Sequence, residues 1–69
     1  MDRSFVSSTN LNSVGYDEST HTLEVEFKEG SIYQYFDVPE SVFAELRGAD
    51  SVGQYFAQNI RSAYRYARL

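Results

Sequence analysis

Strict alternation of apolar and polar side chains over residues 22–28 constrains the fold of this chain most. Leu23, Val25 and Phe27 alternate with Glu24 and other polar residues. Successive side chains of a β-strand point to opposite faces, so a period of two is typical of an antiparallel strand with one buried face. We therefore predict a strand here that defines a core face, carrying the apolar residues, and an outer face, carrying the charged ones.

A second run typical of a β-strand, residues 31–36, follows through a short connection, and the pattern predicts a β-hairpin. Two turns are compatible with that connection. A two-residue Glu29-Gly30 turn needs positive φ at its first position, which glutamate adopts poorly. A type I turn over residues 28–29 with a left-handed Gly30 in a bulge suits these residues better, and we predict that turn.

The choice of turn decides which face Tyr33 and Tyr35 occupy, because a shift of one residue moves every side chain to the other face. The bulged turn pairs Val25 with Tyr33 and Leu23 with Tyr35. We therefore expect both tyrosines to pack on the core face or to border it.

Two helices are predicted after the hairpin. Pro39 suits a first helical position, which favours a short helix over about residues 39–47. Ser51 and Gln54 have the spacing of a capping box, and apolar residues recur at helical spacing over residues 52–67. The side chains expected to cover the sheet are Phe43, Leu46, Phe56, Ile60 and Tyr64.

The length of 69 residues leaves room for one domain, residues 1–69. A weaker strand candidate covers residues 11–16. We predict an α+β fold in which a small three-stranded antiparallel meander is followed by two helices packed on one face. Six Tyr and five Phe can fill such a small core, and the absence of cysteine excludes disulfides and thiolate chemistry.

Charge is distributed unevenly along the chain. Residues 1–50 hold ten acids and three bases, a charge of −7, whereas residues 51–69 hold three arginines and no acid, a charge of +3. A basic segment of this kind can mark a surface for nucleic acid or for an acidic partner. We find neither a long apolar span nor the apolar segment of a signal peptide, so we expect a cytoplasmic location and no membrane partner.

Polar and basic side chains recur along one side of the predicted C-terminal helix. At 100° per residue they fall within a sector of about 80°, and they are Gln54, Gln58, Arg61, Arg65 and Arg68. Such a row can follow a phosphate backbone, and the neighbouring Tyr66 offers a ring for stacking on bases. A solvated helix face, with arginines favoured near the helix C-terminus, explains the same pattern. Both interpretations stay open.

The residue pattern gives little support to catalysis or metal binding. Glu24 and Glu26 share the outer face of a strand, where carboxylates are normally in water and not desolvated for acid–base work. Asp17, Glu18 and His21 share one turn but lack further ligands for a metal. We expect no enzyme activity, no cofactor and no metal site.

Several short motifs together resemble one family. They are Val14-Gly15-Tyr16-Asp17, Leu23-x-Val25-x-Phe27-x-x-Gly30-x-x-Tyr33-x-Tyr35, Val38-Pro39, and Ser51-x-Gly53-x-Tyr55-Phe56 followed by Ile60 and Tyr64. The chain resembles the KTSC domain, which is named for its occurrence at the C-terminus of some lysyl-tRNA synthetases and is also found as small stand-alone bacterial proteins. The resemblance covers about residues 6–68, and the family's Tyr-x-Tyr motif maps onto Tyr33 and Tyr35.

The resemblance implies a domain without an established activity, and its synthetase context suggests RNA binding. It supplies no catalytic residues. Our first hypothesis is therefore a non-enzymatic module for accessory RNA binding through the C-terminal helix, with Arg61, Arg65, Arg68 and Tyr66 in contact with RNA. The alternative is a protein-interaction or assembly module, because the bulged turn sends Ile32 and Phe36 to the outer face, where they could form a contact patch.

Overall fold

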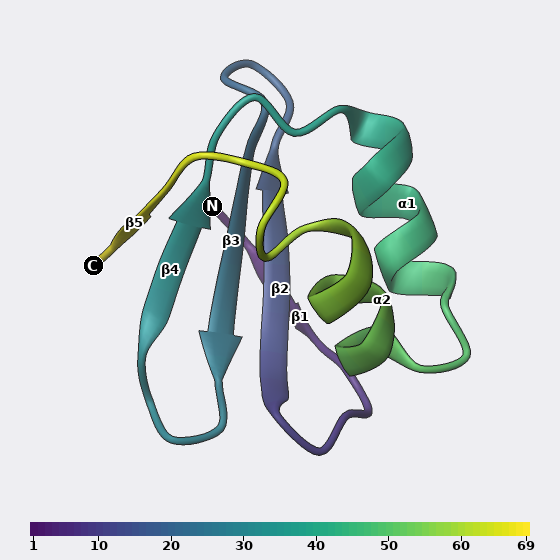
Figure 1. Ribbon diagram of the computed structural model, residues 1–69. Helices are drawn as coiled ribbons and strands as arrows, with labels where there is room; N and C mark the ends of the chain where they lie inside the picture. The colour runs from purple at the N-terminus through teal and green to yellow at the C-terminus, as the bar shows by residue number, and fades with distance from the viewer.

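Five antiparallel strands form one sheet in chain order, and two helices lie on one side of it (Figure 1). This computed structural model describes residues 1–69. The strands are β1 Arg3–Phe5, β2 Leu11–Asp17, β3 Thr22–Phe27, β4 Ile32–Tyr35 and β5 Tyr66–Arg68. The helices are α1 Glu40–Gly48 and α2 Val52–Asn59, and neither is long and apolar enough to cross a lipid bilayer. The predicted α+β class is confirmed.

The β3–β4 hairpin has the bulged turn that its residues favour. Gly30 has a φ of +107°, in the left-handed region that glycine adopts without steric cost. Its N–H donates to the Phe27 carbonyl at 2.9 Å. Val25 pairs with Tyr33, as that turn requires. The predicted register is confirmed, and the two tyrosines of β4 lie on the core face.

The sheet is larger than the three-stranded meander that the sequence predicts. β1 pairs with β2 at one edge, and β5 pairs with β4 at the other. Each of these edge strands has three residues. So short a strand shows no period-two pattern, and the sequence therefore gives no signal for either edge.

The prediction of a helix over residues 52–67 is wrong beyond Asn59. α2 begins as expected, because the Ser51 hydroxyl accepts a hydrogen bond from the Gln54 N–H at 3.3 Å. The helix ends where Ile60 leaves helical geometry, with φ −121° and ψ −49°. The following residues form turns and then β5.

Pairing with β4 explains the extended conformation of the last residues. The Phe36 N–H donates to the Arg65 carbonyl at 2.9 Å, and the Leu69 N–H donates to the Ile32 carbonyl at 2.8 Å. These bonds satisfy backbone groups along an edge of β4 that would otherwise lack protein partners. A contact between residues more than 25 positions apart is invisible to a local helical pattern.

The core lies between the sheet and the two helices. Leu46, Phe56 and Ile60 are buried in it, and Phe43 and Tyr64 pack against it. All five are the residues expected to cover the sheet, so this part of the prediction is confirmed. α1 is shifted by one residue from the predicted range, with Pro39 immediately before its first turn.

Candidate ligand-binding cleft

A cleft opens on the helix side of the sheet, where β4 and β5 meet the turn that follows α2. Its volume is about 610 Å³. Its lining combines aromatic rings, hydroxyls and charges, contributed by Phe27, Glu29, Ser31, Tyr33, Tyr35, Arg61, Ser62 and Tyr66. The two tyrosines of the Tyr-x-Tyr motif therefore share one hollow with Arg61 and Tyr66, two of the residues predicted to contact RNA.

Three tyrosines form the aromatic wall of this cleft. Tyr33 and Tyr35 point to the core face of β4, and β5 places Tyr66 opposite Tyr35. The Tyr66 ring centroid lies 5.8 Å from the centroids of both Tyr33 and Tyr35, which are themselves 6.4 Å apart. These separations lie in the range of favourable aromatic pairs. The short β5 strand thus completes a cluster that the β3–β4 hairpin begins.

Burial differs greatly among the three rings. Tyr35 is only 3% exposed and packs edge-on against Phe56, with centroids 5.4 Å apart. Burial raises the pKa of Tyr35 to about 12, and the neighbouring Tyr33 adds to the rise. Tyr66 is 59% exposed and Tyr33 is half-buried. Tyr35 therefore belongs to the core, whereas Tyr66 and Tyr33 keep ring surface exposed in the cleft.

Two arginines bring positive charge to the tyrosine cluster. Arg68 is paired with Tyr33 in the sheet, and its guanidinium carbon lies 5.8 Å from the Tyr33 ring centroid. This separation is typical of a cation–π contact. Arg61 lies in the turn after α2 and lines the cleft directly. The two cations come from different segments and meet beside the same aromatic rings.

Arg65 lies apart from this cluster. Its Nη2 is 2.8 Å from Oδ2 of Asp37, and its guanidinium carbon is 5.6 Å from the Phe36 ring centroid. The predicted helical row of Arg61, Arg65 and Arg68 is therefore wrong, because residues 60–69 are not helical. The alternation of β5 keeps Arg68 near Tyr33 and sends Arg65 to Phe36.

Glu29 and Ser31 line the cleft and are absent from the residues predicted to bind a ligand. Oε1 of Glu29 accepts hydrogen bonds from the Ser31 N–H, at 3.2 Å, and from the Ser31 hydroxyl. These bonds lower the pKa of Glu29, and the charge of Arg68 lowers it further. The predicted turn places both residues next to Tyr33, which is the signal that could have identified them.

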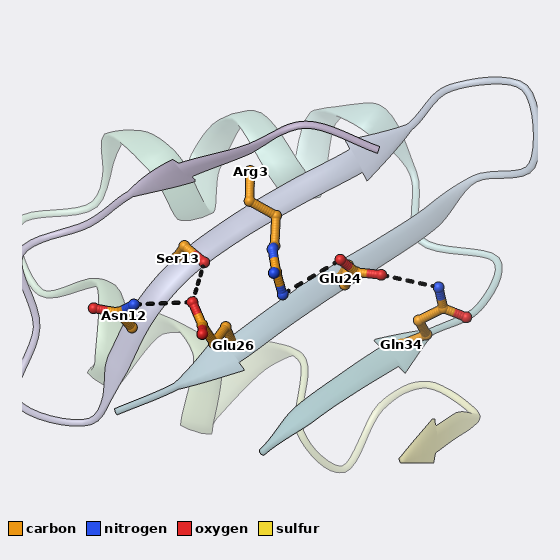
Figure 2. Close-up of polar contacts among 6 residues, drawn as sticks. All are labelled: Arg3, Asn12, Ser13, Glu24, Glu26 and Gln34. Carbon is orange, nitrogen blue, oxygen red and sulfur yellow. Dashed lines mark hydrogen bonds and ion pairs between the residues drawn. The ribbon is translucent and has the colours of Figure 1, made fainter. Parts of the chain in front are cut away.

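The outer face carries a separate network of polar side chains, shown in Figure 2. Arg3 extends from β1 across β2, and its Nη1 lies 3.4 Å from Oε2 of Glu24 on β3. Gln34 on β4 donates to the same carboxylate, with 3.1 Å between Nε2 and Oε1. Side chains from three strands are thereby linked across the sheet.

Glu26 forms the second part of this network (Figure 2). Its Oε1 accepts hydrogen bonds from Asn12 Nδ2 at 2.9 Å and from the Ser13 hydroxyl at 2.8 Å. The bonds from Asn12 and Ser13 lower the pKa of Glu26. The two outer-face glutamates are half-buried and already engaged by neighbouring strands, so they hold the sheet together and do not converge on a cavity.

The acidic turn between β2 and β3 is organised by hydrogen bonds of its own. Asp17 accepts from the Ser19 N–H at 3.0 Å and from the Ser19 hydroxyl at 2.7 Å, which lowers the pKa of Asp17. A hydrogen bond with Glu40 raises the pKa of Glu18. The structure gathers no three His, Asp or Glu side chains where they could hold a metal ion.

Comparison with known proteins gives this fold and its motifs a family. The model of the KTSC domain matches residues 7–64. The chain belongs to the KTSC domain family. A crystal structure of a KTSC domain protein from Yersinia pestis superposes with a TM-score of 0.93 at 33% sequence identity, covering 99% of this chain and 96% of that one.

Curated proteins of two sizes are similar to this chain. An uncharacterized protein of Stutzerimonas stutzeri is 43% identical over 70 residues, which cover 100% of this chain and 99% of that protein. A lysine–tRNA ligase of Nostoc sp. is 48% identical over 54 residues, which cover 78% of this chain. The KTSC chain matches only 10% of the length of that ligase.

Proposed function

We propose that this KTSC domain is a binding module without catalytic activity that takes single-stranded RNA in the cleft lined by Tyr33, Tyr66 and Arg61, with Arg68 beside Tyr33. The observation that carries the proposal is the meeting of the exposed Tyr66 ring, the half-buried Tyr33 ring and Arg61 in one hollow, with Arg68 over the Tyr33 ring. The contact surface is thus the β4–β5 side of the sheet, in place of the helix face expected from the sequence.

Stacking supplies the first half of the chemistry. Proteins that bind single strands place bases on aromatic side chains, and each such contact is worth about 1–3 kcal/mol. Tyr66, at 59% exposure, has free ring surface, and Tyr33 lies 5.8 Å from it. Tyr35 supports both rings from beneath, because it is anchored in the core.

Electrostatic attraction between arginines and RNA phosphates is the second contribution to binding. The small number of arginines keeps this contribution weak. Arg61 and Arg68 provide two charges for phosphates, which corresponds to a slope of about −1.4 for log affinity against log salt on a single strand. So few contacts favour weak binding, suited to an accessory module that adds affinity to another domain or protein. Lysine–tRNA ligases that contain a related segment make transfer RNA a reasonable first RNA to test. The cytoplasmic location stays a prediction.

Fluorescence anisotropy with labelled unstructured RNA and with transfer RNA, at low and moderate salt, tests the proposal. We expect Tyr66→Ala to weaken binding about 5- to 150-fold through lost stacking. Arg61→Gln and Arg68→Gln should each reduce the magnitude of the salt slope by about 0.7. A protein that binds neither RNA at low salt would refute RNA binding by this domain.

Arg47→Gln is the matched control for charge. Arg47 also lies over an aromatic ring, 5.5 Å from the Phe43 centroid, but it belongs to α1 and the Phe43 ring does not line the cleft. We expect this variant to bind RNA with an unchanged salt slope. Arg65→Gln should likewise have a smaller effect than Arg68→Gln, and an equal loss from all these variants would contradict a site in the cleft.

The alternative function, protein interaction through the outer face, has weaker geometric support. Phe5 is 83% exposed there, and Ile32 lies on the same face. However, Ser13 and Glu26 stand between them in the cross-strand row, so the two apolar side chains do not form one continuous patch. Phe36 is paired with Arg65 instead of joining them.

A further inference from the structure

A carboxylate lines the cleft together with the aromatic rings and Arg61. Glu29 is its one acidic lining residue. A negative charge at this position opposes the binding of phosphate, so it weakens any site that recognises only the RNA backbone. The same carboxylate would favour a ligand that brings hydrogen-bond donors to it. The presence of Glu29 in the cleft therefore favours recognition of a base through the donor groups along its edge.

Glu29 is held in an acceptor state. Its Oε1 accepts the N–H and the hydroxyl of Ser31, which orients the carboxylate and lowers its pKa. An ionised carboxylate has about four acceptor sites and no donor. Because the two bonds from Ser31 occupy Oε1, the two lone pairs of Oε2 are left to accept up to two hydrogen bonds from a ligand. At neutral pH the Glu29 carboxylate can therefore only accept hydrogen bonds and cannot donate one.

Guanine is the base whose edges match these groups. Its Watson–Crick edge presents two adjacent donors, N1–H and the 2-amino group, and the two lone pairs of one carboxylate oxygen can accept both. Its Hoogsteen edge presents two acceptors, O6 and N7, which arginine recognises. Adenine offers one amino donor on its Watson–Crick edge, and uracil offers a single N–H. Arg61 in the cleft and Arg68 over Tyr33 can donate to the acceptor edge, while Tyr33 and Tyr66 can stack on the ring face.

We infer that the cleft is selective for guanine, with Glu29 accepting from N1–H and the 2-amino group while the base stacks on Tyr66. This inference rests on the proposed RNA-binding function and adds a specificity residue to it. Unlike Tyr66 and the arginines, Glu29 is expected to contribute to selectivity and little to affinity for RNA in general.

Binding of four short oligouridine RNAs that differ only at the central nucleotide tests this selectivity. The central position is guanosine, inosine, adenosine or uridine, and affinity is measured by anisotropy at low salt. We expect the guanosine RNA to bind about tenfold more tightly than the uridine and adenosine RNAs. Inosine lacks only the 2-amino group, so the inosine RNA should fall between them.

Glu29→Gln is the decisive variant, because an amide replaces one acceptor oxygen by a donor. We expect it to bring the ratio of guanosine to uridine affinity close to one while overall RNA binding persists. Glu18→Gln is the matched control: Glu18 is also an exposed turn glutamate, but it lies in the β2–β3 turn and does not line the cleft. This control should keep the full preference. Far-UV circular dichroism checks that both variants are folded.

The outcomes separate the two proposals. Equal binding of all four RNAs would overturn guanine selectivity and leave RNA binding in the cleft intact. A guanosine preference that survives Glu29→Gln would overturn the role of Glu29. Absence of binding by every RNA at low salt would overturn both the selectivity and the proposed function.

Discussion

Arg3 occupies the space that a side chain on Gly15 would need. A Cβ atom built on Gly15 would lie 2.8 Å from Cγ of Arg3 and 2.5 Å from the carbonyl oxygen of Asp2. Arg3 of β1 and Gly15 of β2 are directly paired in the sheet. The missing side chain lets β1 approach the sheet and lets the Arg3 guanidinium cross β2 to Glu24, as Figure 2 shows.

Gly15→Val should therefore displace β1 and break the contact between Arg3 and Glu24. Forcing extra atoms into a packed site typically costs about 1–3 kcal/mol, and we expect a loss of that size in the free energy of unfolding. Urea denaturation measures the loss, and amide hydrogen exchange should show faster exchange in β1 than in the wild type. Gly48→Ala is the control: nothing lies within 4 Å of its added Cβ, so stability should be unchanged or slightly higher.

Gly30→Ala tests the cost of an unfavourable backbone conformation without a steric clash. No atom lies within 4 Å of an added Cβ at Gly30, but the φ of +107° is one that residues with side chains rarely adopt. We expect a loss of about 1–3 kcal/mol in the free energy of unfolding. Comparison with Gly48→Ala by urea denaturation isolates this backbone effect, and equal stability of the two variants would contradict it.

Tyr16→Phe should cost about 1 kcal/mol of stability. The Tyr16 hydroxyl donates a hydrogen bond to the Val38 carbonyl, and its ring stacks on Phe43 with centroids 5.0 Å apart. The phenylalanine keeps the stacked ring and removes only the donor, so the loss reports one hydrogen bond to a buried residue. Thermal and urea unfolding measure it. Tyr66→Phe, at an exposed ring, should leave stability nearly unchanged by the same measurements.

Acid should weaken the fold through Glu26. Its hydrogen bonds from Asn12 and Ser13 lower its pKa in the folded state, so its stabilising contribution is complete above the unfolded pKa of about 4.3. That contribution disappears as the pH falls through the lower, folded-state pKa. Urea denaturation over a series of pH values should show a smaller acid-induced loss for Glu26→Gln than for the wild type.

Asp17 and Glu29 should also contribute to the loss of stability in acid, as Glu26 does, because their pKa values are lowered in the folded state. Glu18 acts in the opposite direction, since its pKa is raised through Glu40. Protonation of Glu18 therefore favours the folded state slightly as the pH falls. A wild-type curve that gains stability on acidification would contradict the dominant role of the three lowered carboxyls.

Local sequence patterns predict the centre of this fold well. The alternation around Val25 and the glycine at position 30 predict both the strand and its turn, and the turn then sets the pairing with Tyr33. These features depend on neighbours within a few residues. The helix start at Ser51 is predicted for the same reason, because capping is a contact between residues three positions apart.

The candidate site could be predicted only in part. The sequence identifies residue types suited to nucleic acid at Tyr66, Arg61 and Arg68. A helical spacing, however, groups the two arginines with Arg65 and separates them from Tyr33. The chain leaves the helix after Asn59, and alternation along β5 then decides which side chains reach the cleft. Glu29 joins them because the hairpin turn lies at the same end of the cleft.

By itself the sequence determined the β3–β4 hairpin, its register, the apolar faces of the helices and the membership of an α+β class. Only the tertiary structure decided the two edge strands, the end of α2 and the meeting of Tyr33 with Tyr66 and Arg68. The physical reason is the range of the interactions. Turn chemistry and side-chain periodicity act between near neighbours, whereas β5 gains its hydrogen bonds from a strand more than 30 residues earlier in the chain.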